Sequence, residues 1–477
     1  MRKSGVLLFF LVLVVTCIFT FLPVQAEPKT IVVPDDYLTI SSAIQNALVG
    51  DTIFVKKGTH HEEKITIDKS ISLIGESVDE TILSLNPPLV EIWFLRNLLW
   101  VPDTAIRINA DDVKFQRFTI HLPDDYGYRS GISAVGDGIS FIDNKVANRS
   151  VYLSGSNLNI TYNLLPGTLQ VAGSSLTIAC NRIKDILKIQ GSSNLIYANN
   201  IGSGYYSDGI YLNGSLNCVV GNSFSTMEMW DDCNSNFIIG NSFVNLDLKE
   251  FGKGGCSDNI ISKNRVSGHL GINDGIWLWE GENNIISANS IRNCVNGLLL
   301  GTTGKTAVEN SVYLNNFENN ANHVRSLSGS NHTVNHFDNG VKGNYYDDYQ
   351  GNDANGDGVG DSPYVIQETR WEEELKREVT IVFFQDDYPL ISPFDIDSLN
   401  IKLPEWASSA ISSLEPTTPE PTPTPSPTAS PSPSPSSTPI PTGEPEQPEQ
   451  DMTAGAILAV ASIAVFLGLL AYFIKRG

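Results

Sequence analysis

A short segment recurs eight times through the middle of the chain, and this repeat limits the possible folds more than any other feature. Each copy has an isoleucine or valine three residues before one asparagine and an apolar residue two residues after it. The asparagines follow one another at steps of 18 to 26 residues: Asn163, Asn181, Asn199, Asn222, Asn241, Asn264, Asn289 and Asn315. Such a period is too short for a helix pair or a propeller blade, and it matches one turn of a parallel β-solenoid.

The repeat also predicts how successive turns contact one another. Strand residues alternate inward and outward, so each turn contributes a few apolar side chains to one continuous core. The asparagines would lie at the bends, about 4.8 Å apart, where their amides can hydrogen-bond from turn to turn. A second asparagine recurs five residues before the first, at Asn194, Asn217, Asn236, Asn259, Asn284 and Asn310.

The two ends of the chain predict export and membrane anchoring. Arg2 and Lys3 precede an apolar run and a small-residue cleavage pattern that ends at Ala26, which is typical of a signal peptide; an uncleaved anchor is the alternative. Residues 452–474 contain no charge and are long enough to form a transmembrane helix. Lys475 and Arg476 follow at once, which places the bulk of this single-pass cell-membrane protein outside the cell.

Composition separates further segments and excludes one class of partner. Thirteen of the 25 prolines lie between Glu415 and Gln450, which predicts an extended stalk with no packed core. The apolar positions Ile40, Ala43, Ile44, Ala47 and Leu48 share one helical face and predict a helix that covers the first turn of the coil. The net charge of −22 disfavours nucleic acid, because the phosphate backbone would be repelled.

Two flanking signatures add a resemblance to a known group. They are the opening segment Ile31–Pro34 with Gly50–Ile53, and the later segments Gly343–Tyr349 and Asp387–Leu390. With the repeats, they resemble the right-handed parallel β-helix repeat proteins of prokaryotic cell surfaces that are related to the periplasmic copper-binding maturation protein of nitrous oxide reductase. The stalk and the final span are similar to archaeal surface proteins. The resemblance implies an all-β, right-handed parallel β-helix, and it implies no particular activity.

These features predict six segments. They are a signal peptide at 1–26, an N-terminal helical cap with the first coils at 27–110, β-helix repeats at 111–342, a C-terminal cap with a calcium-type loop at 343–400, a Pro/Thr/Ser-rich stalk at 401–450 and a transmembrane helix at 452–474.

A calcium-type loop is predicted near the end of the coil. Oxygen ligands alternate around a glycine turn as in the first nine positions of an EF-hand, at Asp353, Asn355, Asp357, Val359 through its carbonyl, and Asp361. The twelfth position is Tyr364 where a bidentate glutamate is expected. Asp347, Asp348, Asp386 or Asp387 could replace that carboxylate, and a plain polar loop is the alternative.

An outward aromatic stripe is the candidate binding site. Alignment on the repeat places Tyr211, Trp230 and Trp277 in one column, with Asp208, Asp231 and Asp274 beside it. Flat apolar faces flanked by carboxylates suit the stacking and hydrogen bonding of sugars. We therefore predict non-catalytic binding of a polysaccharide or cell-surface glycan, against the alternative that the rings pack on one another.

Catalysis is the first alternative. β-Helix polygalacturonases use a fixed order of motifs, but here Arg182–Lys184 precedes both Asp231-Asp232 and Ser267–His269, and no Asn-Thr-Asp occurs. A lyase acting on acidic polysaccharide needs a basic residue beside acidic ones on one face, and the sequence assigns none. A buried carboxylate pair at Asp231 and Asp274 with a nearby cation would favour an enzyme.

Copper binding is the second alternative. Met227 and Met229 place two thioethers on one side of a strand, with Cys233 and His269 as neighbours, although core filling is favoured.

Cys233 and Cys256 occupy equivalent positions in consecutive copies, so either a disulfide or two stacked thiols is expected. Glycosylation sequons begin at Asn148, Asn159, Asn213 and Asn331.

Overall fold

The computed structural model of the protein describes residues 27–86, 104–122, 131–147, 149–202, 208–230, 232–249, 255–269, 272–302, 307–327, 335–372 and 376–414. The predicted signal peptide and transmembrane segment lie outside these residues, as do most of the predicted stalk and Asp231, Asn148 and Asn331. Within the described ranges, no helix has the length and apolar character needed to cross a membrane.

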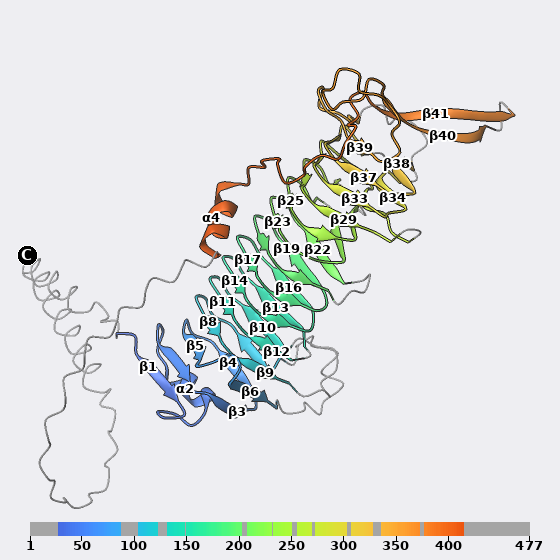
Figure 1. Ribbon diagram of the computed structural model, residues 1–477. Helices are drawn as coiled ribbons and strands as arrows, with labels where there is room; N and C mark the ends of the chain where they lie inside the picture. The colour runs from blue at the N-terminus through green and yellow to red at the C-terminus, as the bar shows by residue number, and fades with distance from the viewer. Residues whose placement is uncertain are drawn as a thin grey trace, which may run out of the picture. The chain divides into compact units, whose positions relative to one another are not determined.

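Short strands wind into stacked rungs whose sheets are parallel (Figure 1). Sheet 1 has thirteen strands, ordered as β1 (Thr30–Val33), β2 (Thr52–Val55), β5 (Ser72–Gly75), β8 (Lys114–Gln116), β11 (Ser140–Ile142), β14 (Asn159–Thr161), β17 (Thr177–Ala179), β20 (Leu195–Tyr197), β23 (Cys218–Val220), β25 (Phe237–Ile239), β28 (Ile260–Ser262), β32 (Ile285–Ser287) and β36 (Ser311–Tyr313). Sheet 2 has twelve, ordered as β4 (Ile65–Ile67), β7 (Ile106–Ile108), β10 (Ile132–Val135), β13 (Val151–Ser154), β16 (Leu169–Ala172), β19 (Leu187–Gln190), β22 (Gly209–Asn213), β24 (Thr226–Trp230), β27 (Asn245–Lys249), β30 (Ile276–Leu278), β34 (Asn296–Leu300) and β38 (Asn322–Ser326).

The third face of the coil consists of two shorter sheets. One contains β3 (Gly58–Glu62), β6 (Thr81–Leu85), β9 (Thr119–His121), β12 (Lys145–Val146), β15 (Leu164–Leu165), β18 (Arg182–Ile183) and β21 (Asn200–Ile201). The other contains β26 (Ser242–Phe243), β29 (Arg265–Ser267), β33 (Ser290–Arg292), β37 (Asn316–Glu318) and β39 (Tyr345–Tyr346). Single bridges from Ser223 to Asn200 and to Ser242 join them. The predicted parallel β-helix is confirmed, and a right-handed coil is consistent with it.

Stacked asparagines line the bends as the repeat predicts. Asn181, Asn199 and Asn222 lie directly over one another, and the Nδ2 of each donates to the Oδ1 of the next at 3.0 Å. The same column runs through Asn144, Asn163, Asn181, Asn199, Asn222, Asn241, Asn264, Asn289, Asn315 and Asn344. Each Oδ1 also accepts the main-chain N–H of the preceding asparagine, so the buried amides are satisfied within the column.

The second asparagine column forms as well. Asn217 donates to Asn236 at 3.1 Å, and the contacts continue through Asn236, Asn259, Asn284, Asn310 and Asn335. Several residues that directly precede an asparagine of the first column have left-handed backbone angles, such as Tyr162 with φ of 60° and Ala198 with φ of 52°. Such angles are unfavourable for non-glycine residues, and the asparagine contacts next to them compensate for the cost.

Each end of the coil carries additional structure. The helix α2 (Ile40–Asn46) buries Ile40, Ala43 and Ile44 and packs near β1 to β4, where the sheets begin. At the other end, β40 (Tyr364–Glu372) and β41 (Arg377–Asp386) form an antiparallel hairpin that projects from the coil (Figure 1). Two further short strands, β31 (Gly281–Glu282) and β35 (Ala307–Val308), pair with each other.

One predicted boundary differs from the structure. The sequence predicts a stalk from residue 401, but Glu405–Leu414 form the helix α4, which packs on β20 of sheet 1. Ala407 of α4 is fully buried against Leu195 and Cys218. The helix forms because this segment precedes the proline-rich run and carries apolar residues that cover an outward apolar patch of sheet 1.

The cysteine alternatives are separated by the structure. Cys233 and Cys256 are buried thiols, and no disulfide joins them. The Sγ of Cys233 lies 3.2 Å from the carbonyl oxygen of Leu212, and that of Cys256 lies 3.8 Å from the carbonyl oxygen of Lys249. Both act as small core residues.

Candidate functional site

The outward face of sheet 2 carries a row of aromatic and charged side chains. In β24, Met227 and Met229 are fully buried and point into the core. Because side chains alternate along a strand, Glu228 and Trp230 point outward. Strand pairing continues the column of Glu228 in both directions, through Lys188, Tyr211, Glu228, Asp247 and Trp277.

This register corrects part of the predicted aromatic stripe. Tyr211 and Trp277 share a column as expected, but Tyr211 pairs with Glu228, and Trp230 pairs with Lys249 in the next outward position. The cause is a turn of unequal length. Tyr211 pairs with Glu228, and Cys218 pairs with Phe237 in the next sheet. Cys218 lies seven residues after Tyr211, whereas Phe237 lies nine residues after Glu228. An alignment that counts back from the repeat asparagine is therefore wrong by two residues at this strand.

A groove of about 390 Å³ lies over β16, β19, β22 and β24. The rings of Tyr211 and Trp230 stand on it with their centroids 6.4 Å apart and their planes inclined by 51°. The Nζ of Lys188 lies 5.9 Å from the centroid of Tyr211. The other polar side chains of the groove are amides, from Gln170, Gln190 and Asn213. The groove therefore combines two flat apolar faces with hydrogen-bonding groups.

Beside the groove, Lys249 is held between two carboxylates. Its Nζ lies 2.7 Å from Glu228 Oε1 and 3.3 Å from Asp247 Oδ2, and all three side chains are at least four-fifths buried. Trp230 Nε1 donates to the other oxygen of Glu228 at 2.9 Å. The ring of Trp279 lies 5.7 Å from Nζ. The outer wall of the site is thus an ordered network of charges and aromatic rings.

The protonation of these groups follows from their surroundings. Burial raises the pKa of Asp247, and Lys249 offsets only part of that effect. Burial opposes the charged form of Lys249, but the hydrogen bond to Glu228 and the charge of Asp247 outweigh it and raise the pKa of Lys249. Burial and then the charge of Glu228 raise the pKa of Tyr211. Lys249 therefore stays charged, and the phenol of Tyr211 keeps its proton.

Removing the central cation tests this network. We expect Lys249→Met to lower the free energy of unfolding by about 1 to 3 kcal/mol at neutral pH, because two like charges are then left close together and mostly buried. The loss should shrink at lower pH as Asp247 takes up a proton. Urea unfolding measures both effects. Lys188→Met, at an exposed position in the column of Glu228 and Asp247, should change stability by less than about 0.5 kcal/mol, and an equal loss in the two variants would contradict the network.

The acidic residues predicted beside the stripe are arranged differently. Asp208 is buried and contributes to the raised pKa of Tyr211. Asp274 accepts a hydrogen bond from Asn296 at 2.6 Å. Asp231 lies outside the described residues. Sequence reasoning missed Glu228, Asp247 and Lys249, although the alternation of both segments with buried apolar residues is the signal that places them outward.

The residues considered for copper do not fit that ion. Met227, Met229 and Cys233 are fully buried within the apolar core, and the Sγ of Cys233 hydrogen-bonds to main-chain oxygens. His269 is exposed. The thioethers fill the core between rungs, as the alternative of core filling predicts.

The calcium-type loop is compact and exposed. The carboxylate of Asp353 accepts the main-chain N–H groups of Gly356, Asp357 and Gly358 at 2.7 to 3.2 Å. Asp361 accepts from Ala354 at 2.9 Å, Asn355 donates to Asp357, and Val359 N–H donates to Asp357.

The expected extra carboxylates are engaged elsewhere. Asp347 and Asp348 contact His323, and Asp386 contacts Asn344. Asp387 accepts from Gln385. Tyr364, at the twelfth loop position, donates its hydroxyl to Asp348 at 3.3 Å. Calcium binding by the loop stays a prediction.

Comparison with known proteins bears on the fold and on one segment. Residues 250–351 match the sequence model of the family described as periplasmic copper-binding protein (NosD). This supports the resemblance for that part of the β-helix. None of the curated proteins matches the chain in sequence.

Several solved structures are similar at low identity. The A-module of mannuronan C-5 epimerase AlgE6 from Azotobacter vinelandii has 10% identity and a TM-score of 0.41, covering 62% of this chain and 92% of its own. A mannuronic acid specific polysaccharide family 6 lyase from human gut microbiota has 13% identity and a TM-score of 0.37, covering 63% and 83%. Pectin methylesterase PemA from Erwinia chrysanthemi has 13% identity and a TM-score of 0.21, covering 65% and 93%. These similarities assign no residue and no chemistry to this chain.

Proposed function

We propose that the protein binds a polysaccharide in the groove of sheet 2 and does not cleave it. The observation that carries the proposal is the pair of rings, Tyr211 and Trp230, standing 6.4 Å apart over a groove of about 390 Å³. Pyranose rings present apolar faces that stack on aromatic side chains, while their hydroxyls pair with amides. The amides of Gln170, Gln190 and Asn213 supply such partners along the groove.

The charges beside the groove favour binding over lyase chemistry. A lyase acting on an acidic polysaccharide needs a base for the sugar C–H proton and a cation that neutralises the substrate carboxylate. Lys249 already faces two carboxylates, and its raised pKa makes it a poor base. The raised pKa of Tyr211 has the same effect on its phenol. Lys188 is the exposed cation above the groove, and it can attract an acidic sugar.

Copper handling is the second candidate, since residues 250–351 match the copper-binding family model. The burial of Met227 and Met229 argues against these two residues as its ligands.

The proposal includes the setting of the groove. The predicted signal peptide, proline-rich stalk and C-terminal span would hold the coil outside the cell, where polysaccharides are found. Calcium in the loop from Asp353 to Asp361 would fasten the end of the coil and would take no part in binding.

Polysaccharide binding is tested with the full-length protein and an array of acidic and neutral polysaccharides, scored for retention and for product release. We expect retention without new reducing ends or unsaturated products. Trp230→Ala should weaken binding about 10- to 30-fold, because it removes one of the two stacking faces. Tyr152→Ala is the matched control, since Tyr152 lies outward on β13 of the same sheet but outside the groove.

Two results would overturn the proposal. One is equal retention by the Trp230→Ala and Tyr152→Ala proteins, which would place binding elsewhere. The other is release of cleaved product, which would make the protein an enzyme. Asn213 heads a sequon and also lines the groove, so a glycan attached there would occupy the site. Binding assays therefore use protein produced without glycosylation.

A further inference from the structure

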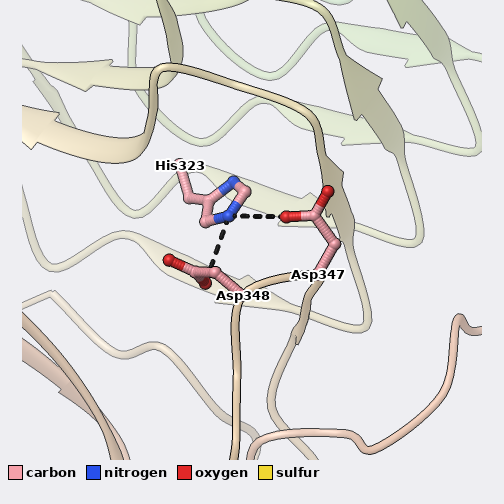
Figure 2. A group of neighbouring side chains, drawn as sticks. All are labelled: His323, Asp347 and Asp348. Carbon is pink, nitrogen blue, oxygen red and sulfur yellow. Dashed lines mark ion pairs between the residues drawn. The ribbon is translucent and has the colours of Figure 1, made fainter.

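At the C-terminal end of the coil, one imidazole faces two carboxylates (Figure 2). His323 lies on β38, whereas Asp347 and Asp348 directly follow β39. The Nε2 of His323 lies 3.0 Å from Asp347 Oδ1 and 3.2 Å from Asp348 Oδ1. Within the described part of the chain, this is the one group of at least three histidine, cysteine or acidic side chains whose ligand atoms all lie within 4.8 Å of one another.

The scaffold holds each of the three side chains in place. The second oxygen of Asp347 accepts the main-chain N–H of Asn319 at 2.6 Å, and that of Asp348 accepts the hydroxyl of Tyr364 at 3.3 Å. His323 is more than nine-tenths buried, and its ring packs beside Phe317 and Tyr346 with centroid distances of 6.2 and 5.9 Å. These contacts with the scaffold hold the Oδ1 atoms of Asp347 and Asp348 and the Nε2 of His323 toward one point, as in preorganised metal sites.

The cluster is buried at one side and open at the other. The side chain of His323 is 6% exposed, whereas those of Asp347 and Asp348 are 37% and 61% exposed. An ion bound by the three ligands would thus keep positions for water. Two carboxylate oxygens and one imidazole nitrogen directed at the same point form a ligand set that suits a cation.

From this arrangement we propose that His323, Asp347 and Asp348 bind a divalent transition-metal ion. One nitrogen and two oxygen ligands with open water positions suit Zn²⁺ and Cu²⁺. Cu⁺ prefers thioether and thiolate ligands, and the site offers none. The proposal does not depend on polysaccharide binding, because the residues are separate from the groove.

Asn320 determines which ring nitrogen of His323 carries the proton that a bound ion would replace. Its Oδ1 accepts from Cys294 N–H at 2.9 Å, and its Nδ2 donates to the carbonyl of Ile291 at 3.0 Å and faces His323 Nδ1 at 3.4 Å. Nδ1 is then the acceptor, and Nε2 holds the proton shared with the carboxylates. A bound ion takes the place of this proton, which moves to Nδ1. The Nδ1–H of His323 and the Nδ2 of Asn320 are then two donors 3.4 Å apart, so metal binding requires the amide of Asn320 to move away from Nδ1.

Metal binding is tested by titrating the full-length protein with Zn²⁺ and with Cu²⁺ and recording calorimetry and the electron paramagnetic resonance spectrum of the Cu²⁺ form. We expect one ion per chain and a Cu²⁺ spectrum with coupling to a single nitrogen. His323→Ala should weaken Zn²⁺ binding at least about 100-fold, and Asp348→Asn about 10- to 100-fold. The exposed His336→Ala, in the same end of the coil, should leave the affinity unchanged.

The variants separate this site from others. Asp348 is well exposed, so Asp348→Asn is a test that does not disturb the core if His323→Ala fails to fold. Excess Ca²⁺ should not displace Zn²⁺, because Ca²⁺ takes oxygen ligands and the cluster includes an imidazole nitrogen. Zn²⁺ binding that is equal in the wild-type and Asp348→Asn proteins, or a Cu²⁺ spectrum with no nitrogen coupling, would overturn the proposal.

Discussion

Replacing Asn222 with alanine is expected to lower the free energy of unfolding by about 3 to 6 kcal/mol, because it leaves several buried polar groups without partners. The Oδ1 of Asn222 accepts the main-chain and side-chain N–H groups of Asn199 at 2.8 and 3.0 Å. Its Nδ2 donates to the carbonyl of Ile196 at 2.9 Å and to Asn241 at 3.0 Å. Water cannot replace these contacts, because Asn222 is 98% buried in the column.

Urea unfolding measures this loss, and hydrogen exchange locates it. Because each rung contacts only its neighbours, exchange should rise first in β20, β23 and β25. Asn200→Ala is the matched control, since Asn200 belongs to the same repeat but is exposed, and it should cost less than about 0.5 kcal/mol. A similar loss in both variants would mean that the column does not stabilise the coil.

The asparagine column ends on a buried carboxylate, which predicts a pH-dependent stability. Asp386 is fully buried, and one of its oxygens accepts from Asn344 N–H at 2.7 Å while the other accepts from Tyr388 N–H at 3.1 Å. Burial raises the pKa of Asp386 to about 7, although these hydrogen bonds lower it. The folded state therefore binds a proton between pH 7 and the ordinary value of 3.8, where the unfolded state does not.

The sign of the effect follows from this proton. Above pH 7 the ionised carboxylate makes the folded state less stable, and stability is regained as the pH falls through the folded pKa. Between pH 8 and pH 5 we expect a gain of about 3 kcal/mol from Asp386. Asp386→Asn removes the titrating group, so this part of the gain should disappear from urea unfolding at the two pH values.

The neighbouring Asp387→Asn provides the control for Asp386. Asp387 is exposed, so its substitution should leave the pH dependence close to that of the wild-type protein. If Asp386→Asn and wild type gained equally on acidification, Asp386 would already be ionised at pH 5, and the carboxylate at the end of the column would not be the source of the effect.

The lateral site and the metal cluster differ in how far sequence reasoning could reach. Tyr211 and Trp277 share a column because both follow the same Gly-Ile pattern at the start of a strand. Trp230 was misplaced because the turn after β24 is two residues longer than the turn after β22. The sequence gives the number of residues between two strands only once the strand ends are known, and the pairing of the strands fixes those ends.

His323 could not be joined to its partners from the sequence. The sequence pattern offers Asp347 and Asp348 only as carboxylates for the loop that follows them, whereas the structure places them against the imidazole of His323, one rung away. Similarly, Asp386 meets Asn344 only because the hairpin of β40 and β41 returns the chain to the end of the column. The eight copies of the repeat end at Asn315, so their period predicts neither contact.

The sequence alone was sufficient to predict the parallel β-helix and the stacking of Asn181, Asn199 and Asn222. In a coil of this kind each rung contacts its neighbours, so a periodic residue type becomes a column. Only the tertiary structure decided which outward side chains meet across rungs, as Lys249 does with Glu228 and Asp247, and which groups gather at the coil's end. These contacts depend on the lengths of the turns and on the hairpin that brings the chain back to the coil, and the period of the repeat encodes neither.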